Sequence, residues 1–331
     1  MFAITGATGH VGNNVVRELL AREKDARIRA LVLPNEDTTS LRGLPIEMVK
    51  GNILDMESLL QTSEDAHVAF HIAGAISLIP GDHDKVMRIN VDGTKNVIAA
   101  CKKSGVKRLV YTSSNEALKK PSSSIDPKTI EIDPEGGSCG AYGKSKAHAS
   151  LEVLKAVNDG SLDAVLVCPT GVMGPNDFLP SLFGKSLKEW ATSKVHIHFG
   201  GSYDFVDVRD VALGHILAYE KGKSGEIYLL SSGQETSIPD ILEMVDEIMG
   251  KQSVRIQIPL VLMRFIAFLI TFYSHWKKIP ARVTNNAIDI LYEKSILSNE
   301  KTIRDLGYAP RPTKESFRDT IEWLQKAGKI R

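Results

Sequence analysis

Apolar residues in the first half of the chain form short continuous runs, separated by longer segments in which apolar positions recur at helical spacing. This alternation predicts a parallel sheet covered by helices on both faces, and right-handed crossovers make it doubly wound. The expected strands are Phe2–Thr5, Ile28–Leu33, Ile46–Lys50, Val68–Ile72, Arg108–Thr112 and Ala164–Cys168, and the expected helices are Val11–Ala21, Ser58–Ser63, Lys85–Lys103 and Ala141–Val157.

The pattern changes after Pro169. Residues 175–203 contain scattered Gly and Pro without clear strand alternation, and the last third of the chain has mostly helical spacing. We therefore expect an α/β protein with a smaller, mostly helical second domain. Its further elements are expected as strands at Phe205–Val208 and Ile227–Leu230 and as helices at Val211–Lys221, Ile238–Met249, Leu260–Tyr273 and Ser316–Lys326.

Composition narrows the class of protein. The chain has 331 residues, enough for two domains and a core that needs no disulfide or metal. Lys and Arg number 41 against 40 Asp and Glu, so the net charge of +1 gives no general attraction for nucleic acid. Three widely spaced cysteines form no disulfide framework, and no secretory signal precedes the first strand. We expect a cytoplasmic protein with reduced thiols.

One apolar stretch, Ile258–Tyr273, is a candidate membrane segment. It has 16 residues and contains Arg264, whereas a spanning helix needs about 20 apolar residues. We expect a buried or pocket-covering helix and no membrane contact. The alternative is a helix lying in the membrane interface, with Trp276 and the following lysines at the lipid headgroups.

A glycine-rich turn follows the first strand, at Thr5-Gly6-Ala7-Thr8-Gly9-His10-Val11-Gly12. Glycines in this context allow a tight turn, a close approach of the backbone to a pyrophosphate, and close packing of helix on strand. The helix N-terminus adds unpaired N–H groups for the phosphates. The turn predicts a Rossmann-type dinucleotide-binding domain at residues 1–169 and 204–236. A substrate-binding domain is expected at residues 170–203 and 237–331.

The choice between NAD and NADP is usually made at the end of the second strand, where a carboxylate favours NAD and an arginine favours NADP. Here Leu33 ends the strand, while Glu36, Asp37 and Arg42 come later. Both cofactors stay open, with a lean to NADP because no carboxylate occupies the strand end itself.

Tyr142 and Lys146 are four residues apart in a predicted helix and therefore share one face. A tyrosine has a pKa of about 10, and a neighbouring cation lowers it by stabilising the phenolate. Tyr142 is thus a candidate general acid or base at a carbonyl or alcohol oxygen. Ser114, at the end of the Arg108–Thr112 strand, is a candidate to hydrogen-bond that oxygen, because Ser113 still points along the strand. A loop serine that caps backbone groups is the alternative.

Together these motifs resemble the extended short-chain dehydrogenase/reductase superfamily, and most closely its dihydroflavonol-reductase-like and 3β-hydroxysteroid-dehydrogenase-like branch. The resemblance covers nearly the whole chain. Besides the glycine turn and the YxxxK pair, it rests on Phe70-His71-Ile72-Ala73-Gly74, Asn90-Val91-Asp92-Gly93-Thr94, Thr112-Ser113-Ser114, Pro169-Thr170-Gly171-Val172-Met173-Gly174-Pro175, Phe205-Val206-Asp207-Val208-Arg209-Asp210 and Leu306-Gly307-Tyr308-Ala309-Pro310.

The resemblance implies that Ser114, Tyr142 and Lys146 are the catalytic residues and that Asn90 orders a water or the active-site helix. It also implies the cofactor-binding set: Gly6, Thr8, Gly9, His10, Val11, Gly12, Leu33, Asn52, Ile53, Ala73, Gly74, Thr112, Tyr142, Lys146, Pro169, Thr170, Gly171 and Val172. Two positions depart from the family pattern. Asn52 stands where an acidic residue often contacts adenine, and Leu33 replaces a basic residue of many reductases.

The resemblance leaves a reductase and a nucleotide-sugar epimerase or dehydratase to be distinguished. Sugar-nucleotide enzymes commonly carry an arginine for the diphosphate where this chain has Tyr203. The second domain instead offers an apolar set for a hydrophobic substrate: Leu179, Leu182, Phe183, Leu260, Met263, Phe265, Phe268 and Tyr273.

We therefore expect an NAD(P)-dependent oxidoreductase that interconverts a ketone or aldehyde and its alcohol. A nucleotide-sugar epimerase or dehydratase with tightly bound NAD is the alternative, and a dinucleotide-sensing module is a third hypothesis. Relatives often pair through the helix of Tyr142, so a homodimer is allowed. No metal site is expected, because His196 and His198 lack a third ligand.

Overall fold

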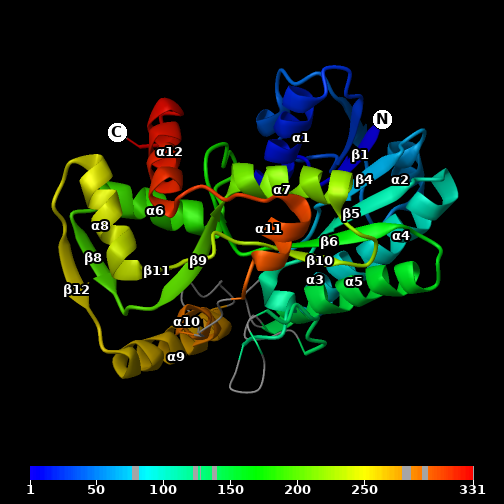
Figure 1. Cartoon of the computed structure of the whole chain (residues 1–331). Coiled ribbons are helices and arrows are strands. Elements are labelled where there is room, and N and C mark those ends of the chain that lie inside the picture. The colour runs from blue at the N-terminus through cyan, green and yellow to red at the C-terminus, as the bar shows by residue number, and fades with distance from the viewer. Residues whose placement is uncertain are drawn as a thin grey trace.

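The computed structural model describes residues 1–76, 82–121, 126, 128–135, 140–277, 285–292 and 297–330. Its largest unit is a seven-stranded parallel sheet in the order β10-β6-β5-β4-β1-β2-β3, which confirms the predicted doubly wound α/β class (Figure 1). The strands are β1 (Phe2–Thr5), β2 (Ile28–Val32), β3 (Glu47–Lys50), β4 (Val68–His71), β5 (Arg108–Thr112), β6 (Ala164–Pro169) and β10 (Ile227–Leu230).

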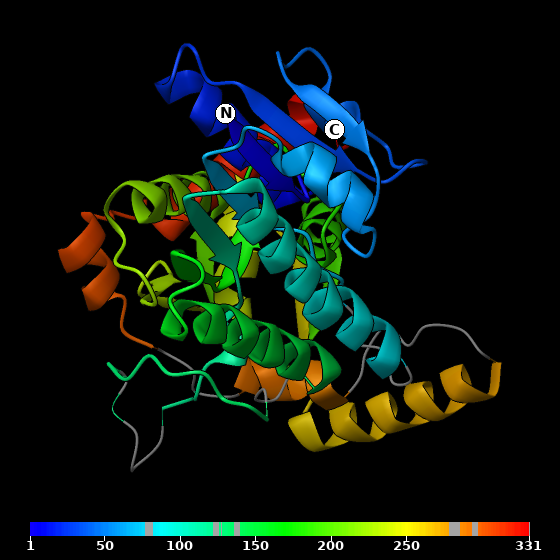
Figure 2. The same cartoon turned by 90° about the vertical axis from the view of Figure 1, so that its right-hand side faces the viewer.

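Successive side chains of these strands point to opposite faces of the sheet and pack into two separate hydrophobic cores, one on each face. Phe2 and Ile4 of β1 join one apolar cluster with helices α1 and α7, whereas Ala3 between them joins the cluster on the other face, with α2, α4 and α5. Figure 2 shows the sheet with helices on both of its sides. The continuous apolar runs of the sequence arise from this burial on both faces. The helices are α1 (His10–Arg22), α2 (Met56–Ser63), α3 (His83–Met87), α4 (Gly93–Ser104), α5 (Gly140–Asn158), α7 (Val208–Lys221) and α11 (Glu300–Leu306).

The helix expected at Lys85–Lys103 is not continuous. A π-helical turn at Arg88–Asp92 separates α3 from α4 and contains Asn90. Single π turns within helices often occur at functional sites, because the extra residue re-aims one side chain.

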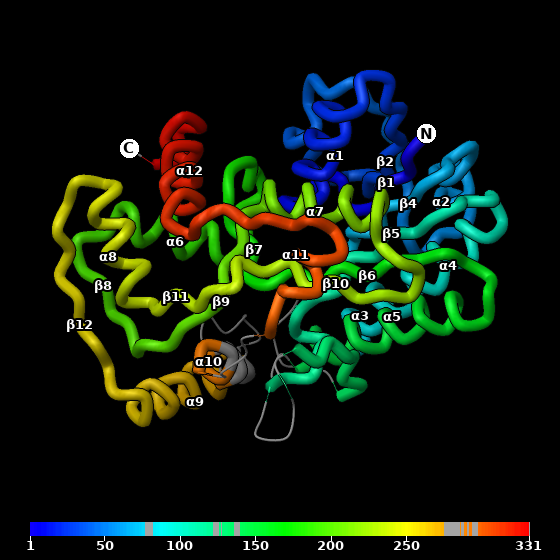
Figure 3. The backbone as a smooth tube through the Cα atoms, in the orientation of Figure 1, coloured from blue at the N-terminus to red at the C-terminus, as the bar shows by residue number. Residues whose placement is uncertain are grey.

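The second part of the chain lies beside the main sheet (Figures 1 and 3). It contains a three-stranded sheet, β11-β9-β7, and a two-stranded parallel sheet, β12-β8. The strand expected at Phe205–Val208 is β9, which pairs with β7 and β11 and not with the main sheet. The elements are β7 (Gly171–Met173), α6 (Leu182–Thr192), β8 (Val195–His198), β9 (Ser202–Asp207), β11 (Glu235–Ser237), α8 (Ile238–Met249), β12 (Val254–Gln257) and α12 (Thr313–Lys326).

Two further helices, α9 (Leu260–Lys277) and α10 (Asn285–Tyr292), lie against each other at the lower end of the molecule in Figure 1. The expectation of a buried helix is wrong for much of this stretch, whereas the expectation of a pocket-covering helix stays a prediction. Ala267 and Ser274 are buried, but Val261 and Phe272 are 81% and 70% exposed, because α9 has the described protein on one side only. Among the described helices, none is long and apolar enough to cross a membrane.

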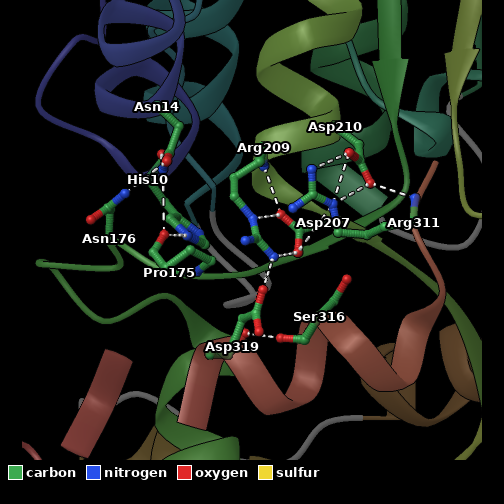
Figure 4. A network of polar contacts seen from close by, with 11 residues as sticks. His10, Asn14, Pro175, Asn176, Asp207, Arg209, Asp210, Arg311, Ser316 and Asp319 are labelled. Atoms are coloured by element: carbon green, nitrogen blue, oxygen red, sulfur yellow. Dashed lines mark hydrogen bonds and ion pairs between the residues drawn. The ribbon is translucent and has the colours of Figure 1, made fainter. Parts of the chain in front are cut away.

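An ion-pair network fixes the C-terminal part to the start of α7 (Figure 4). Asp207 caps α7 by accepting the Arg209 backbone N–H at 2.8 Å, and the Arg209 guanidinium bridges Asp207 and Asp319 of α12. Arg311 pairs with Asp210 at 2.8 Å. The Asp207–Asp210 motif therefore joins the second part to the sheet domain.

Candidate active site

The glycine turn lies at the carboxyl end of β1, beside the switch point where the strand order reverses between β1 and β4. Gly6 has a φ of +76°, and a Cβ there would stand 2.6 Å from the Ala73 backbone nitrogen. A Cβ on Gly12 would lie 2.0 Å from the Gly6 carbonyl oxygen. Glycine is therefore required at both positions. Gly9 caps α1 without a side-chain hydrogen bond, so the first N–H groups of the helix face the turn.

The other residues of the turn make contacts that hold it in place. His10 Nε2 and the Pro175 carbonyl oxygen are 3.0 Å apart, which ties α1 to the loop after β7 (Figure 4). The Thr8 hydroxyl donates to Glu36 Oε1 at 2.6 Å, and Val11 is half-buried under the turn.

Glu36 revises the interpretation of the second strand. Leu33 is 49% exposed at the strand end, but the chain turns back there, and Glu36 Oε2 accepts the Leu33 N–H at 3.1 Å. A carboxylate therefore does stand at the end of β2, three residues later in sequence than the pattern requires. The premise for the lean to NADP is wrong for this reason.

Asn52 and Ile53 follow the neighbouring strand β3. Asn52 is exposed and its Oδ1 accepts the Leu54 N–H at 2.9 Å, while Ile53 is buried. A Cβ on Gly93 would lie 2.5 Å from Ile53 Cδ1, so α4 packs closely on this turn. The pair borders the same sheet edge as Leu33.

Three consecutive residues at the end of β5 point in different directions. The Thr112 hydroxyl bonds His215 Nε2 of α7 at 2.8 Å, and the Ser113 hydroxyl bonds Ser150 of α5 at 2.7 Å. Ser114 accepts the Glu116 N–H at 3.2 Å and donates to Asn115 Oδ1 at 3.4 Å. Ser114 thus caps the short turn Asn115–Ala117, as the alternative interpretation allows, and its donor bond is at the limit of hydrogen-bond length.

Tyr142 and Lys146 lie one turn apart in α5. Lys146 is buried and its Nζ donates to the Thr112 carbonyl oxygen at 2.7 Å. A Cβ on Gly74 would lie 3.1 Å from this Nζ, so the ammonium stands between the ends of β4 and β5. Burial lowers the pKa of Lys146 from 10.5 to about 8.

Asn90 links these strand ends to α5. Its Oδ1 accepts the Ala75 N–H at 2.8 Å, and its Nδ2 donates to Ser145 Oγ at 2.8 Å. Ser145 in turn donates to the Tyr142 carbonyl oxygen at 2.7 Å. Asn90 therefore connects the loop after β4 with α5, and its ordering of the active-site helix stays a prediction.

On the other side of β5, β6 ends at Pro169 and leads through Thr170 into β7. Thr170 donates its N–H to the Leu230 carbonyl, and Gly171 and Val172 are half-buried. A Cβ on Gly171 would lie 2.7 Å from the Tyr203 ring, so glycine lets β7 pass beneath this tyrosine.

Sequence reasoning missed a polar cluster around Ser114. The Tyr203 hydroxyl donates to Glu116 Oε1 at 2.7 Å, and Asn115 Nδ2 donates to the Tyr203 oxygen at 3.2 Å. Glu116 is 4% exposed and pairs with Lys120 at 3.4 Å. The sequence gives one indication of this cluster, which is that Asn115 and Glu116 directly follow Ser114.

The apolar residues expected around a substrate do not gather in one place. Phe183 packs in the core of the second part, with its ring 4.3 Å from that of Phe205. Leu182, Phe265 and Phe268 are 62%, 58% and 57% exposed. Across the described ranges, no group of His, Cys, Asp and Glu is arranged to hold a metal ion.

The chain is similar to known proteins both in sequence and in structure. A sequence model of the 3-beta hydroxysteroid dehydrogenase/isomerase family matches residues 3–229. Sterol demethylase protein B of Methylococcus capsulatus is 32% identical, covering 99% of this chain and 99% of that protein. A putative dihydroflavonol 4-reductase of Synechocystis is 31% identical, covering 100% and 96%. The crystal structure of gox2253 superposes with a TM-score of 0.84 at 30% identity, covering 100% and 99%.

Proposed function

This chain belongs to the 3-beta hydroxysteroid dehydrogenase/isomerase family, and on that premise we propose that it interconverts a hydrophobic ketone and its secondary alcohol with a nicotinamide dinucleotide. The observation that carries the proposal is the placement of Lys146. Its buried ammonium is fixed by the carbonyl oxygen of Thr112, two residues before Ser114, and Lys146 follows Tyr142 by one turn of α5. A buried cation next to a tyrosine suits proton transfer at a carbonyl oxygen.

The residues at the switch point fit a dinucleotide. A Cβ on Gly6 would clash with the Ala73 backbone and one on Gly12 with the Gly6 carbonyl, so both glycines are needed for the tight path of the turn, and the N–H groups at the start of α1 suit the phosphates. Glu36 would accept hydrogen bonds from the adenosine ribose and repel a 2′-phosphate, so we propose NAD as the preferred cofactor. When bound, the nicotinamide supplies or accepts the hydride.

In this proposal Tyr142 moves the proton. Its hydroxyl donates to the substrate oxygen in reduction and accepts from the alcohol in oxidation. In this proposal the Lys146 cation would stabilise the phenolate form of Tyr142, and the Thr112 carbonyl accepts a hydrogen bond that holds the ammonium in place.

Ser114 holds the substrate oxygen. Its acceptor position is already used by the Glu116 N–H, whereas its proton makes only the long contact with Asn115. That proton is therefore available for a stronger bond to a substrate oxygen.

The substrate class follows from Tyr203 and from the relatives. A neutral tyrosine hydroxyl at this position offers no bidentate cation for a diphosphate. The similarity to sterol demethylase protein B supports a sterol-like alcohol or ketone. The hydroxyl to be oxidised would approach Ser114 and Tyr142 from the side of Tyr203.

The test follows reduced-nicotinamide absorbance with a panel of 3-hydroxysteroids, 3-ketosteroids and dihydroflavonols, each with NAD(H) and NADP(H). We expect turnover of at least one sterol-like pair. Tyr142→Phe should lower kcat by about a hundredfold or more, because it removes the proton donor and acceptor. Lys146→Met should lower it comparably, and Tyr219→Phe, which changes a tyrosine packed on β1 and β4, serves as the control. Full activity of Tyr142→Phe would refute the mechanism.

A nucleotide-sugar epimerase or dehydratase predicts a different outcome. The purified protein would then carry bound NAD and would convert a sugar nucleotide without net change in nicotinamide absorbance. That result, combined with no activity on the steroid panel, would replace the proposed reaction.

A further inference from the structure

The ammonium of Lys146 is buried without a carboxylate partner. Lys146 is 4% exposed, and no acidic side chain among the described residues pairs with it. Within the described part of the chain its Nζ makes one hydrogen bond, to the Thr112 carbonyl oxygen at 2.7 Å. Removing a charge from water is costly unless other groups compensate for the lost hydration. The surroundings of Nζ contain one further group suited to a cation.

This group is the aromatic ring of Tyr111. Lys146 Nζ lies over the ring at 5.2 Å from its centroid, which is within the range of a cation–π contact. Tyr111 directly precedes Thr112 in β5, so the ring and the carbonyl oxygen that contact Nζ come from neighbouring residues. The face of an aromatic ring carries partial negative charge, and its attraction for a cation is strongest where both are removed from water.

Packing holds the Tyr111 ring in this position. The side chain is fully buried in the hydrophobic cluster on the α5 side of the main sheet. The ring of His71 in β4 lies beside it, with the two ring centroids 5.5 Å apart. The buried Tyr111 hydroxyl has no hydrogen-bond partner among the described residues, so the contribution of this side chain comes from its ring.

The other titratable groups around Lys146 are neutral near pH 7. Burial, together with the charge of Lys146, lowers the pKa of His71 to about 3. Burial raises the pKa of the Cys168 thiol in β6 to about 12. Tyr142, one turn earlier in α5, is the group whose proton is proposed to move. The ring of Tyr111 and the Thr112 carbonyl are therefore the fixed groups that favour the charged form of Lys146.

We propose that Tyr111 is a positioning residue for the proton transfer, whose ring face keeps the Lys146 ammonium charged and in place. The proposal rests on the roles given above to Tyr142 and Lys146. A charged ammonium stabilises a phenolate, whereas a neutral amine does not. A residue that only fills the core needs the right volume, but this role needs the negative face of an aromatic ring.

The test compares two rings of similar shape and opposite face charge at position 111. Tyr111→Phe keeps the negative ring face, whereas pentafluorophenylalanine at the same position reverses its sign. In full-length protein labelled with carbon-13 at the lysine ε carbon, the Lys146 signal, assigned by its loss in Lys146→Met, reports the charge of the ammonium. We expect the pKa of Lys146 to be unchanged in Tyr111→Phe. The fluorinated ring should lower it by about 1, a tenfold rise in the acid dissociation constant.

Turnover provides a second readout. Because kcat falls as Lys146 loses its charge, the fluorinated ring at position 111 should move the alkaline limb of the kcat–pH profile about 1 pH unit lower, with little change in KM. Tyr228 offers the matched control, since it is also fully buried and its ring centroid lies 5.3 Å from Lys301 Nζ. Pentafluorophenylalanine at position 228 should change neither the pKa of Lys146 nor the pH profile.

An equal pKa of Lys146 with both rings at position 111 would overturn the proposal, because Tyr111 would then only fill space. If the pentafluorinated protein folds poorly, 4-fluorophenylalanine at position 111 should give a smaller shift in the same direction, and no shift would again overturn the proposal. Absence of turnover in the unchanged protein would instead count against the proposed reaction. The carbon-13 titration would still decide whether the Tyr111 ring supports the charge of Lys146.

Discussion

The side-chain amide of Asn90 donates a hydrogen bond to the hydroxyl of Ser145 at 2.8 Å, and both groups are buried. The two residues are 55 positions apart in sequence, in the π turn and in α5. Because the other side of Asn90 is bonded to Ala75, this contact sets the position of α5, and thus of Tyr142, against the strand ends.

Asn90→Ala should therefore reduce turnover more than nucleotide binding. The buried Ser145 hydroxyl and the Ala75 N–H would each lose a partner, at a cost of about 1–3 kcal/mol of folding stability. We expect kcat to fall by about tenfold with a small change in the Kd for the dinucleotide. Asn96→Ala is the matched control, because Asn96 bonds only the Ile53 carbonyl among the contacts described. Equal loss of kcat in both variants would contradict a positioning role for Asn90.

Alanine substitutions at Gly6 and Gly43 distinguish the effect of backbone strain from the effect of a steric clash with neighbouring backbone. Both have positive φ, +76° and +79°, but a Cβ on Gly43 has nothing within 4 Å, whereas one on Gly6 meets the Ala73 backbone at 2.6 Å. Each substitution by Ala should cost about 1–2 kcal/mol from the left-handed conformation alone. Only Gly6→Ala should also abolish dinucleotide binding in calorimetry. Normal affinity in Gly6→Ala would show that the turn does not approach a ligand.

Replacing Glu36 tests the cofactor preference. Glu36→Gln keeps the hydrogen-bonding shape but removes the charge that would oppose a 2′-phosphate. We expect the ratio of kcat/KM for NADPH to kcat/KM for NADH to rise by about tenfold. That factor corresponds to about 1.4 kcal/mol, the size of one charged contact. The exposed neighbour Asp37, whose carboxylate accepts the Thr39 N–H, provides the control variant Asp37→Asn. A protein that already prefers NADPH would contradict the assignment.

Two buried histidines make the fold sensitive to acid. Burial, aided by the Lys146 charge, lowers the pKa of His71 from 6.5 to about 3, and burial lowers that of His215 to about 4. Each folded-state pKa lies below the unfolded value. Their stabilisation is complete above pH 6.5 and is lost as the pH falls toward 3–4, because only the unfolded chain takes up the proton there. At about pH 5, each should cost about 2 kcal/mol of unfolding free energy.

The hydrogen bonds of His71 fit a neutral ring, which has one donor and one acceptor nitrogen. Thr94 donates its hydroxyl proton to the Asn90 carbonyl, so His71 Nε2 is the donor to Thr94 and Nδ1 accepts from Thr5. Urea unfolding at several pH values measures the effect. His71→Asn should be less stable at neutral pH but should show a flatter dependence on pH, whereas exposed His83→Asn should change neither. An unchanged slope in His71→Asn would assign the acid sensitivity to other groups.

The sequence alone determined the features that depend on local order. Strands β1, β5 and β10 have the predicted bounds, because continuous apolar runs mark burial on both sheet faces. Gly6 and Gly12 were recognisable from spacing, and Tyr142 and Lys146 share a face of α5 because four residues make about one helical turn. Strand burial, glycine spacing and the shared face of a helix depend only on nearby residues. They can therefore be predicted without knowing which elements pack against each other.

Only the tertiary structure decided how distant side chains meet. The return of the loop after β2 brings Glu36 to the strand end, and hydrogen-bonded strands bring distant residues together: β9 lies beside β7 in one sheet, and Tyr203 of β9 contacts Glu116. The exposure of apolar side chains along α9 was equally hidden, because an apolar helix has the same sequence whether its neighbours cover it or leave it open. Such contacts depend on loop paths and on which elements pack together, and no local periodicity records either.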